Sequence, residues 1–276
     1  GLAIAGVNER RRGAQVAVTA TGIKRPPPLH RPPLVIDLSA LWAGPLAAHL
    51  LWLADAEVVK VESRNRPDAM RGGDPQLFAR INQGKASVQL DLRAGEDREA
   101  LIALIRRADI VIEAARPRAL RQLGIDADSL VRETPGLIWM TITGHGIAED
   151  AANWVGFGDD CGVAGRLSAA MLGATGQPAF VGDAIADPMT GISAARYGWE
   201  CWRGNIAGRL TISMRDIVGE ALRDEQARDA DGFDEALRHW GQAAGQPFAL
   251  VPHREAGPVR PLGADNAAWL GGARPC

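Results

Sequence analysis

Residues 34–63 read LVIDLSALWAGPLAAHLLWLADAEVVKVES, and this stretch decides the fold of the chain. It opens with an apolar run, LVIDLSA, which is typical of a buried strand. A turn and a helix follow at 43–54, with Pro45 near the first helical position, where its missing N–H costs no hydrogen bond. The closing run, AEVVKVES at 56–63, predicts a second strand. A strand, a helix and a strand in this order form a β-α-β unit, so the two strands are expected to be parallel.

The same alternation continues along the chain. Further strands are predicted at 86–92, 109–115, 136–144 and 208–214, with a short extended piece at 178–182. Helices are predicted between them, at 96–108, 126–135, 159–173 and 188–203. Strands that alternate with helices of this length indicate an α/β fold, here a Rossmann-like domain with a mainly parallel sheet. In such sheets ligands bind at the carboxyl ends of the strands.

Composition shifts predict where the domain begins and ends. Residues 24–33, KRPPPLHRPP, are rich in proline, which favours an extended linker. Residues 1–33 are therefore predicted to be an N-terminal appendage with a proline-rich linker. Residues 34–220 form the Rossmann-like domain. Residues 221–276 turn charged and are predicted to be an irregular tail.

Bulk properties exclude several classes of protein. With 276 residues, 46% of them hydrophobic, the chain can bury a large core, and its formal net charge of −2 gives no field for binding nucleic acid. The sequence lacks the run of about 18 apolar residues that a membrane span needs, and residues 1–14 are too weakly apolar for a signal peptide. Three widely spaced cysteines, Cys161, Cys201 and Cys276, indicate reduced thiols rather than a metal motif. A cytoplasmic protein without bound metal is expected.

Charged and glycine-containing segments follow the predicted strands. The turn LWAGP at 41–45 could hold a phosphate or an adenine, or be only a tight turn, and it lacks the G-x-G-x-x-G pattern of dinucleotide sites. Lys60 and Glu62 are expected to be solvated, although Glu62 stands near the position of a ribose-binding acid and keeps a dinucleotide-binding oxidoreductase open. The arginines of AARPRALR at 114–121 are either solvated or a phosphate clamp.

The acidic stretch FVGDAIADPMTG at 180–191 raises a separate question, because Asp187 could cap the helix that follows or attack a substrate. The positive end of that helix would stabilise the ionised carboxylate in either role. His145, in a glycine loop, is either a turn residue or a catalyst. Asp159 and Asp160 precede another helix, which one of them could cap; a paired acid/base site is the alternative.

These pieces in this order resemble the family III CoA-transferases, which include formyl-CoA:oxalate and carnitine CoA-transferases and the α-methylacyl-CoA racemases. The resemblance covers about residues 34–218. Its landmarks are VIDLSALWAGPLAAHLL, AEVVKVES, NQGKASVQLDLR, ADIVIEAARPRALRQLGI, GLIWMTITGHG, GDAIADPMTG and GRLTISMRDIV. Relative to the family pattern, the C-terminal segment is expected to be shortened.

The resemblance implies a site and a reaction. Asp187 would be the nucleophile that attacks an acyl-CoA, with a carboxylic acid as the second substrate and CoA as substrate rather than tightly bound cofactor. The implied CoA contacts are Trp42, Ala43, Leu90, Asp91, Leu92, Arg93, Ala114, Ala115 and Arg116, with Arg64 or Arg66 facing a phosphate. A homodimer or a partner chain is also implied.

Three alternatives stay open beside the transferase. The racemase branch carries a histidine where this chain has Phe157, so racemisation would lack one of its two bases. A catalytically silent CoA-binding or interaction subunit is the second alternative. The dinucleotide-binding oxidoreductase is the third.

Overall fold

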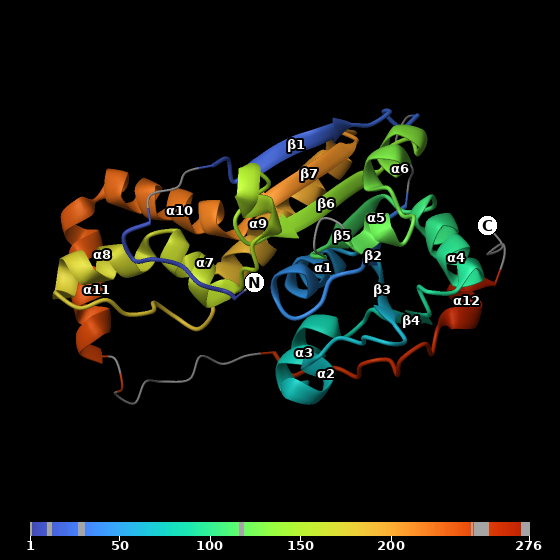
Figure 1. The fold of residues 1–276 in the computed structure, drawn as a ribbon. Coiled ribbons are helices and arrows are strands. Elements are labelled where there is room, and N and C mark those ends of the chain that lie inside the picture. The colour runs from blue at the N-terminus through green and yellow to red at the C-terminus, as the bar shows by residue number, and fades with distance from the viewer. Residues whose placement is uncertain are drawn as a thin grey trace. The chain divides into compact units, whose positions relative to one another are not determined.

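The computed structural model (Figure 1) describes residues 2–9, 13–26, 31–115, 119–243, 245 and 254–271. It contains two compact units, each built from segments that are far apart in the sequence. Unit 1 comprises Gly1–Val16, Thr143–Thr190 and Ile212–Arg254, and unit 2 comprises Ala17–Ile142, Gly191–Thr211 and Glu255–Cys276. The domain boundaries expected from composition stay a prediction.

A seven-stranded sheet, almost wholly within unit 2, has the strand order β1-β7-β6-β5-β2-β3-β4. The strands are β1 Val16–Thr21, β2 Leu34–Asp37, β3 Glu57–Ser63, β4 Ala86–Leu90, β5 Ile110–Glu113, β6 Ile138–Thr143 and β7 Gly208–Ser213. The pairs β2/β3, β2/β5, β3/β4 and β5/β6 are all parallel. The α/β fold with a mostly parallel sheet is therefore confirmed.

The central strands are buried along their whole length, which explains why each begins with a run of apolar residues. All four residues of β2 and all four of β5 are buried. Ile36 pairs with Val59 on one side and with Val111 on the other, and all three side chains belong to the main core. Both faces of a parallel sheet are normally covered by its crossover connections, and here α1 packs against β2, β3 and β5.

Each of the two units has its own set of helices. Unit 2 holds α1 Ala43–Leu53, α2 Met70–Gly73, α3 Pro75–Asn82, α4 Gly95–Ile105, α5 Ala119–Gln122, α6 Ala127–Glu133 and α12 Asn266–Leu270. Unit 1 holds the 3₁₀ helix η1 Glu149–Asn153 and α7 Gly158–Ala164, α8 Leu167–Thr175, α10 Met214–Arg228 and α11 Ala230–Ala243. Helix α9, Ala186–Arg203, has residues in both. Among the described residues, no helix has the length and apolar character needed to cross a membrane.

Two segments have more regular structure than the sequence suggested. Residues Val16–Thr21, ahead of the proline-rich linker, form the edge strand β1, because four of the six residues of VAVTAT are β-branched. Gly22 N–H donates to Ala207 O next to β7. In the predicted irregular tail, α11 forms because its apolar residues fall on one face, where Leu237 is buried, while its charges lie on the other.

One predicted helix is broken and one predicted extended piece is absent. The helix expected at 159–173 is two helices, α7 and α8, separated at Gly165 and Arg166. The φ angle of Arg166 is 76°, a left-handed conformation that no helix continues through. Residues 178–182 form no strand.

Candidate functional site

The strand-end loops of unit 2 lie where an α/β sheet normally binds ligands. The chain passes from β2 to β3 on one side, whereas β5 pairs with β2 on the other, so the strand order reverses between β2 and β5. The crevice outside such a reversal is the usual ligand site. Trp42 and Ala43 follow β2, and Ala114 and Ala115 follow β5.

Four further predicted CoA contacts lie at the end of β4, at the same edge of the sheet: Leu90, Asp91, Leu92 and Arg93. Leu90 is 1% exposed, so a ligand could contact only its backbone. Asp91 and Leu92 are partly exposed and Arg93 is exposed. The Asp91 carboxylate accepts hydrogen bonds from Asn65 Nδ2 at 2.9 Å and from Arg93 N–H at 3.1 Å, which fixes this loop. Arg116 lies outside the described residues.

The turn between β2 and α1 is held in a strained conformation. Leu41 has a φ angle of 69°, which is uncommon for a branched side chain, and its N–H donates to Asp68 Oδ1 at 3.2 Å. A Cβ at Gly44 would overlap the side chain of Ser39, so the close approach of the helix to the turn requires glycine. Non-glycine residues in such conformations persist only where the surrounding structure enforces them.

Two buried lysines enforce this turn. Lys85 Nζ lies 2.8 Å from Asp37 Oδ2, at the end of β2, and 2.8 Å from the carbonyl oxygen of Pro45, in the first turn of α1. Lys60 Nζ lies 3.0 Å from the carbonyl oxygen of Ser39 and 3.0 Å from Asp68 Oδ2. Burial alone would raise the pKa of Asp37, but the charges of Lys85 and Lys60 outweigh burial and lower it. Burial lowers the pKa of Lys85 to about 8, against the opposing charge of Asp37.

The expectation that Lys60 and Glu62 are solvated is wrong. Lys60 is 2% exposed and Glu62 is 5% exposed, because residues 68–71 fold over the end of β3. The Glu62 carboxylate accepts a hydrogen bond from Arg71 Nη2 at 2.5 Å and another from Asp68 N–H at 2.9 Å. Its oxygens are therefore engaged within the protein, which removes the argument for a ribose-binding acid.

The low pKa of Lys85 predicts how stability changes with pH. The folded pKa of about 8 lies below the ordinary lysine value of 10.5, so between these two pH values the unfolded chain binds more protons at Lys85 than the folded protein does. The contribution of Lys85 to the free energy of unfolding therefore increases with pH, by about 2 kcal/mol from pH 7.5 to 9.5. Urea unfolding of the wild type and of Lys85→Met at both values should show the difference between them widening. A constant or narrowing difference would contradict the shift.

Asp187, the predicted nucleophile, lies in unit 1, in the first turn of α9. The helix begins at Ala186, so Asp187 is inside it rather than at the capping position. Its N–H donates to the carbonyl oxygen of Ala184 at 2.9 Å, and its side chain is partly exposed. The unpaired N–H groups at the start of a helix favour a negative charge, so the position stabilises the ionised carboxylate.

The first turn of α7 lies directly against Asp187. A Cβ at Gly158 would overlap both Asp187 Oδ2 and the carbonyl oxygen of Ala184, so a side chain there would displace the carboxylate. Asp159 Oδ1 accepts a hydrogen bond from Ala184 N–H at 3.0 Å, which ties α7 to the loop before α9. Asp160 Oδ1 accepts from Phe157 N–H at 2.7 Å and so caps α7, as expected for one of the two aspartates.

A buried histidine and cysteine lie beside this turn. His145 follows β6 and its ring meets that of Trp154 edge to face, with centroids 5.6 Å apart. Cys161 donates through Sγ to the carbonyl oxygen of Gly144 at 3.3 Å. Burial raises the pKa of the Cys161 thiol well above its usual value, and the carboxylates of Asp160 and Asp187 raise it further. The effect of Asp187 on this pKa shows that its carboxylate lies near the thiol.

The family profile and the curated relatives that match this chain are all CoA-transferases. The profile of CoA-transferase family III matches residues 33–197. A succinate–glutarate CoA-transferase from Agrobacterium fabrum is 34% identical over 184 residues, which are 60% of this chain and 46% of that protein. A formyl-CoA:oxalate CoA-transferase from Escherichia coli O6:H1 is 27% identical over 217 residues, 72% of this chain and 51% of the other.

A succinyl-CoA:mesaconate CoA-transferase from Haloarcula hispanica is 36% identical over 122 residues, covering 41% of this chain and 31% of that enzyme. The chain thus spans between about a third and a half of the length of these curated relatives.

Solved structures share the fold. A hypothetical protein from Mycobacterium tuberculosis superposes with a TM-score of 0.63 at 23% identity, over 79% of this chain and 60% of that one. A CaiB/BaiF family protein from Brucella suis gives a TM-score of 0.57 at 27% identity, over 73% of this chain and 57% of the other.

Proposed function

The chain belongs to CoA-transferase family III, and from this premise we propose that it moves CoA from an acyl-CoA thioester to a carboxylic acid through Asp187. The observation that carries the proposal is the position of Asp187. It is a partly exposed carboxylate in the first turn of a helix, and only glycine at position 158 lets the carboxylate keep this position, because a Cβ there would overlap Asp187 Oδ2. A carboxylate that is ionised and accessible can act as a covalent nucleophile.

The proposed reaction divides one difficult displacement into easier steps. An Asp187 oxygen attacks the thioester carbonyl, the C–S bond breaks, and an acyl-aspartyl anhydride and CoA thiolate form. The thiolate then attacks the aspartyl carbonyl of the anhydride, which releases the donor acid as a carboxylate and leaves an aspartyl-CoA thioester. The acceptor carboxylate attacks this thioester to give a second anhydride, and the returning thiolate takes the new acyl group and frees Asp187.

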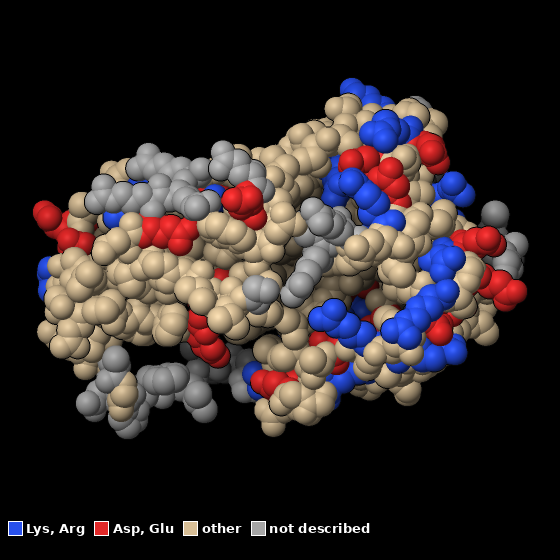
Figure 2. Space-filling model, in the orientation of Figure 1, with Lys and Arg blue, Asp and Glu red and all other residues tan. Residues whose placement is uncertain are grey.

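We propose that the strand-end loops of unit 2 hold CoA. The support is the reversal of strand order between β2 and β5 and the rigid turn that carries Trp42 and Ala43. CoA is an anion, and Figure 2 shows several groups of Lys and Arg over the part of the surface formed by unit 2. Arg64 and Arg66 at the end of β3 are exposed and remain the proposed phosphate contacts.

The names of the relatives suggest which substrates to try first. Succinate, glutarate, mesaconate and oxalate are all dicarboxylic acids. We therefore propose a dicarboxylic acid as the acceptor. CoA would act as a substrate rather than as a tightly bound cofactor, the reaction would take place in the cytoplasm, and a homodimer or a partner chain would complete the enzyme.

Intact-protein mass spectrometry tests the proposal directly. The purified chain is mixed with succinyl-CoA, formyl-CoA or acetyl-CoA, with hydroxylamine as a trap and Asp187→Ala as the control. We expect a covalent adduct that hydroxylamine removes and that is absent in the variant. CoA binding without an adduct from any donor would instead support the silent CoA-binding subunit, and an adduct that persists in Asp187→Ala would move the nucleophile elsewhere.

Gly158→Ala is expected to reduce adduct formation by roughly 100-fold, because small misplacements of a reacting group have effects of this size. The added methyl group would overlap Asp187 Oδ2 and displace the carboxylate. The rate of adduct formation from stopped samples provides the measurement.

The matched control for this variant is Gly173→Ala in α8, where a Cβ meets nothing within 4 Å. The control should keep the wild-type rate and gain slightly in helix stability. Equal rates for both variants would show that Gly158 does not position Asp187.

A further inference from the structure

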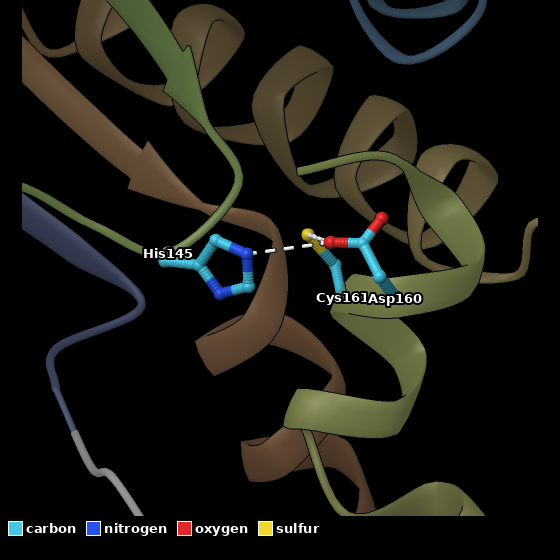
Figure 3. A group of neighbouring side chains, drawn as sticks. All are labelled: His145, Asp160 and Cys161. Atoms are coloured by element: carbon cyan, nitrogen blue, oxygen red, sulfur yellow. Dashed lines mark hydrogen bonds and ion pairs between the residues drawn. The ribbon is translucent and has the colours of Figure 1, made fainter. Parts of the chain in front are cut away.

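Three side chains that can bind a metal converge in unit 1, from two parts of the chain (Figure 3). His145 comes from the loop after β6, and Asp160 and Cys161 are neighbours in α7. His145 Nε2 lies 3.3 Å from Asp160 Oδ2, and Cys161 Sγ lies 3.9 Å from the same oxygen. All three ligand atoms lie within 4.8 Å of one another. They provide one nitrogen, one oxygen and one sulfur around a common point.

His145 supplies an independent indication of a missing partner. It is 1% exposed, and neither of its ring nitrogens makes a hydrogen bond to any described residue. A buried polar group without a partner costs about 1–3 kcal/mol, and native proteins normally satisfy such groups. In Figure 3 one ring nitrogen faces the Asp160 carboxylate, at ion-pair distance but outside hydrogen-bond geometry. A cation between the three groups would satisfy this nitrogen.

The distances fit a small tetrahedral ion. Zinc binds histidine nitrogen, carboxylate oxygen and thiolate sulfur at about 2.0–2.3 Å, and tetrahedral ligands at these lengths lie about 3.3–3.8 Å apart. The separations of Asp160 Oδ2 from His145 Nε2 and from Cys161 Sγ, 3.3 and 3.9 Å, are close to that range. The mixed N, O and S set also selects the ion, because Mg²⁺ and Ca²⁺ prefer oxygen ligands alone.

The local backbone is built to bring these groups close. A Cβ at Gly156 would lie 2.7 Å from Cys161 Sγ and 3.0 Å from His145 Nε2, so any larger residue there would push them apart. A Cβ at Gly144 would lie 2.7 Å from the Cα of Gly156. The other Asp160 oxygen caps α7, which fixes the carboxylate while leaving Oδ2 directed at the cluster.

We propose that His145, Asp160 and Cys161 form a site for a zinc-type divalent cation, with a water molecule as the fourth ligand. On binding, a metal–sulfur bond replaces the S–H bond of Cys161, and the thiol proton passes to solvent. His145 binds through Nε2, and the Asp160 carboxylate binds through Oδ2. The bound ion would join the loop after β6 to α7 and stabilise unit 1. This inference is independent of the proposed CoA transfer.

Cobalt titration of the full chain, freed of metal by a chelator, tests the site. Co²⁺ bound by a thiolate gives a charge-transfer band in the near ultraviolet, and the intensity of its visible bands reports tetrahedral coordination. We expect one equivalent of Co²⁺ to produce both signals and Zn²⁺ to remove them. The melting temperature should rise with Zn²⁺. Failure of the wild-type chain to bind either ion at stoichiometric concentration would overturn the proposal without any variant.

Variants identify the ligands. Cys161→Ser should lose the charge-transfer band, whereas the double variant Cys201→Ser/Cys276→Ser, which keeps only Cys161, should retain it. Loss of an outer partner of a metal ligand alone costs about 10- to 100-fold in affinity, so His145→Gln is expected to lose roughly 100-fold or more. A band that persists in Cys161→Ser, or wild-type affinity in His145→Gln, would place the metal elsewhere and overturn the assignment.

Discussion

Asp187→Asn is expected to lower the rate of CoA transfer by roughly 10³-fold or more and to leave the affinity for CoA within about twofold, because loss of a covalent nucleophile acts on the chemical step. Asparagine matches the shape of aspartate and keeps an oxygen at the start of α9, so the helix and the neighbouring Gly158 are undisturbed. The substitution removes only the negative charge of the side chain, and with it the nucleophilic carboxylate oxygen that attacks the thioester. Transfer is followed by chromatography of the CoA esters, and CoA binding by calorimetry.

Asp183→Asn is the matched control for this prediction. Asp183 is exposed, lies four residues earlier in the loop before α9, and should be replaceable without effect on transfer. Circular dichroism of both variants separates a chemical role from a structural one. If Asp187→Asn lost CoA affinity and folded structure together, Asp187 would be a helix-stabilising residue, and the proposed mechanism would lose its nucleophile.

The strands of the sheet could be predicted because burial is encoded locally. The first three residues of β2 and of β5 are apolar, and a run of consecutive apolar residues is typical of a strand covered on both faces. The helix that begins at Ala186 was likewise predicted to within two residues, since Pro188 suits its first turn. The β-α-β rule then gives the parallel direction of the strands, so the strand ends that could bind CoA were also predictable from the sequence.

The buried charges could not be predicted, because their partners are distant in sequence. Lys85 and Asp37 are 48 residues apart in the sequence, and the residues next to each of them do not indicate that the two form an ion pair. A lysine read alone is assigned to solvent, as Lys60 was. Contacts between distant segments are equally hard to predict from sequence. The closeness of Gly158 to Asp187 depends on how α7 packs on the loop before α9. Local sequence carries no record of such packing.

Lys85→Met is expected to lower the free energy of unfolding by about 3–5 kcal/mol, the effect of removing one partner from a buried ion pair. Methionine is similar in length, so the change removes the charge and the hydrogen bonds rather than packing volume. Asp37 then keeps a buried charge supported by Ser39 and by no described lysine at hydrogen-bond distance, and the carbonyl oxygen of Pro45 loses the hydrogen bond from Lys85. Urea unfolding at pH 7.5 gives the measurement.

Lys24→Met is the matched control, because Lys24 is exposed and the same substitution there should change the free energy of unfolding by less than about 0.5 kcal/mol. The double variant Lys85→Met/Asp37→Asn should regain part of the loss, since it removes the buried carboxylate charge that the single variant leaves without its lysine. If Lys85→Met and Lys24→Met were equally stable, the turn at 39–45 would owe its conformation to packing alone. A large loss with recovery in the double variant would instead show that the buried charge pair holds the start of α1 against the end of β2.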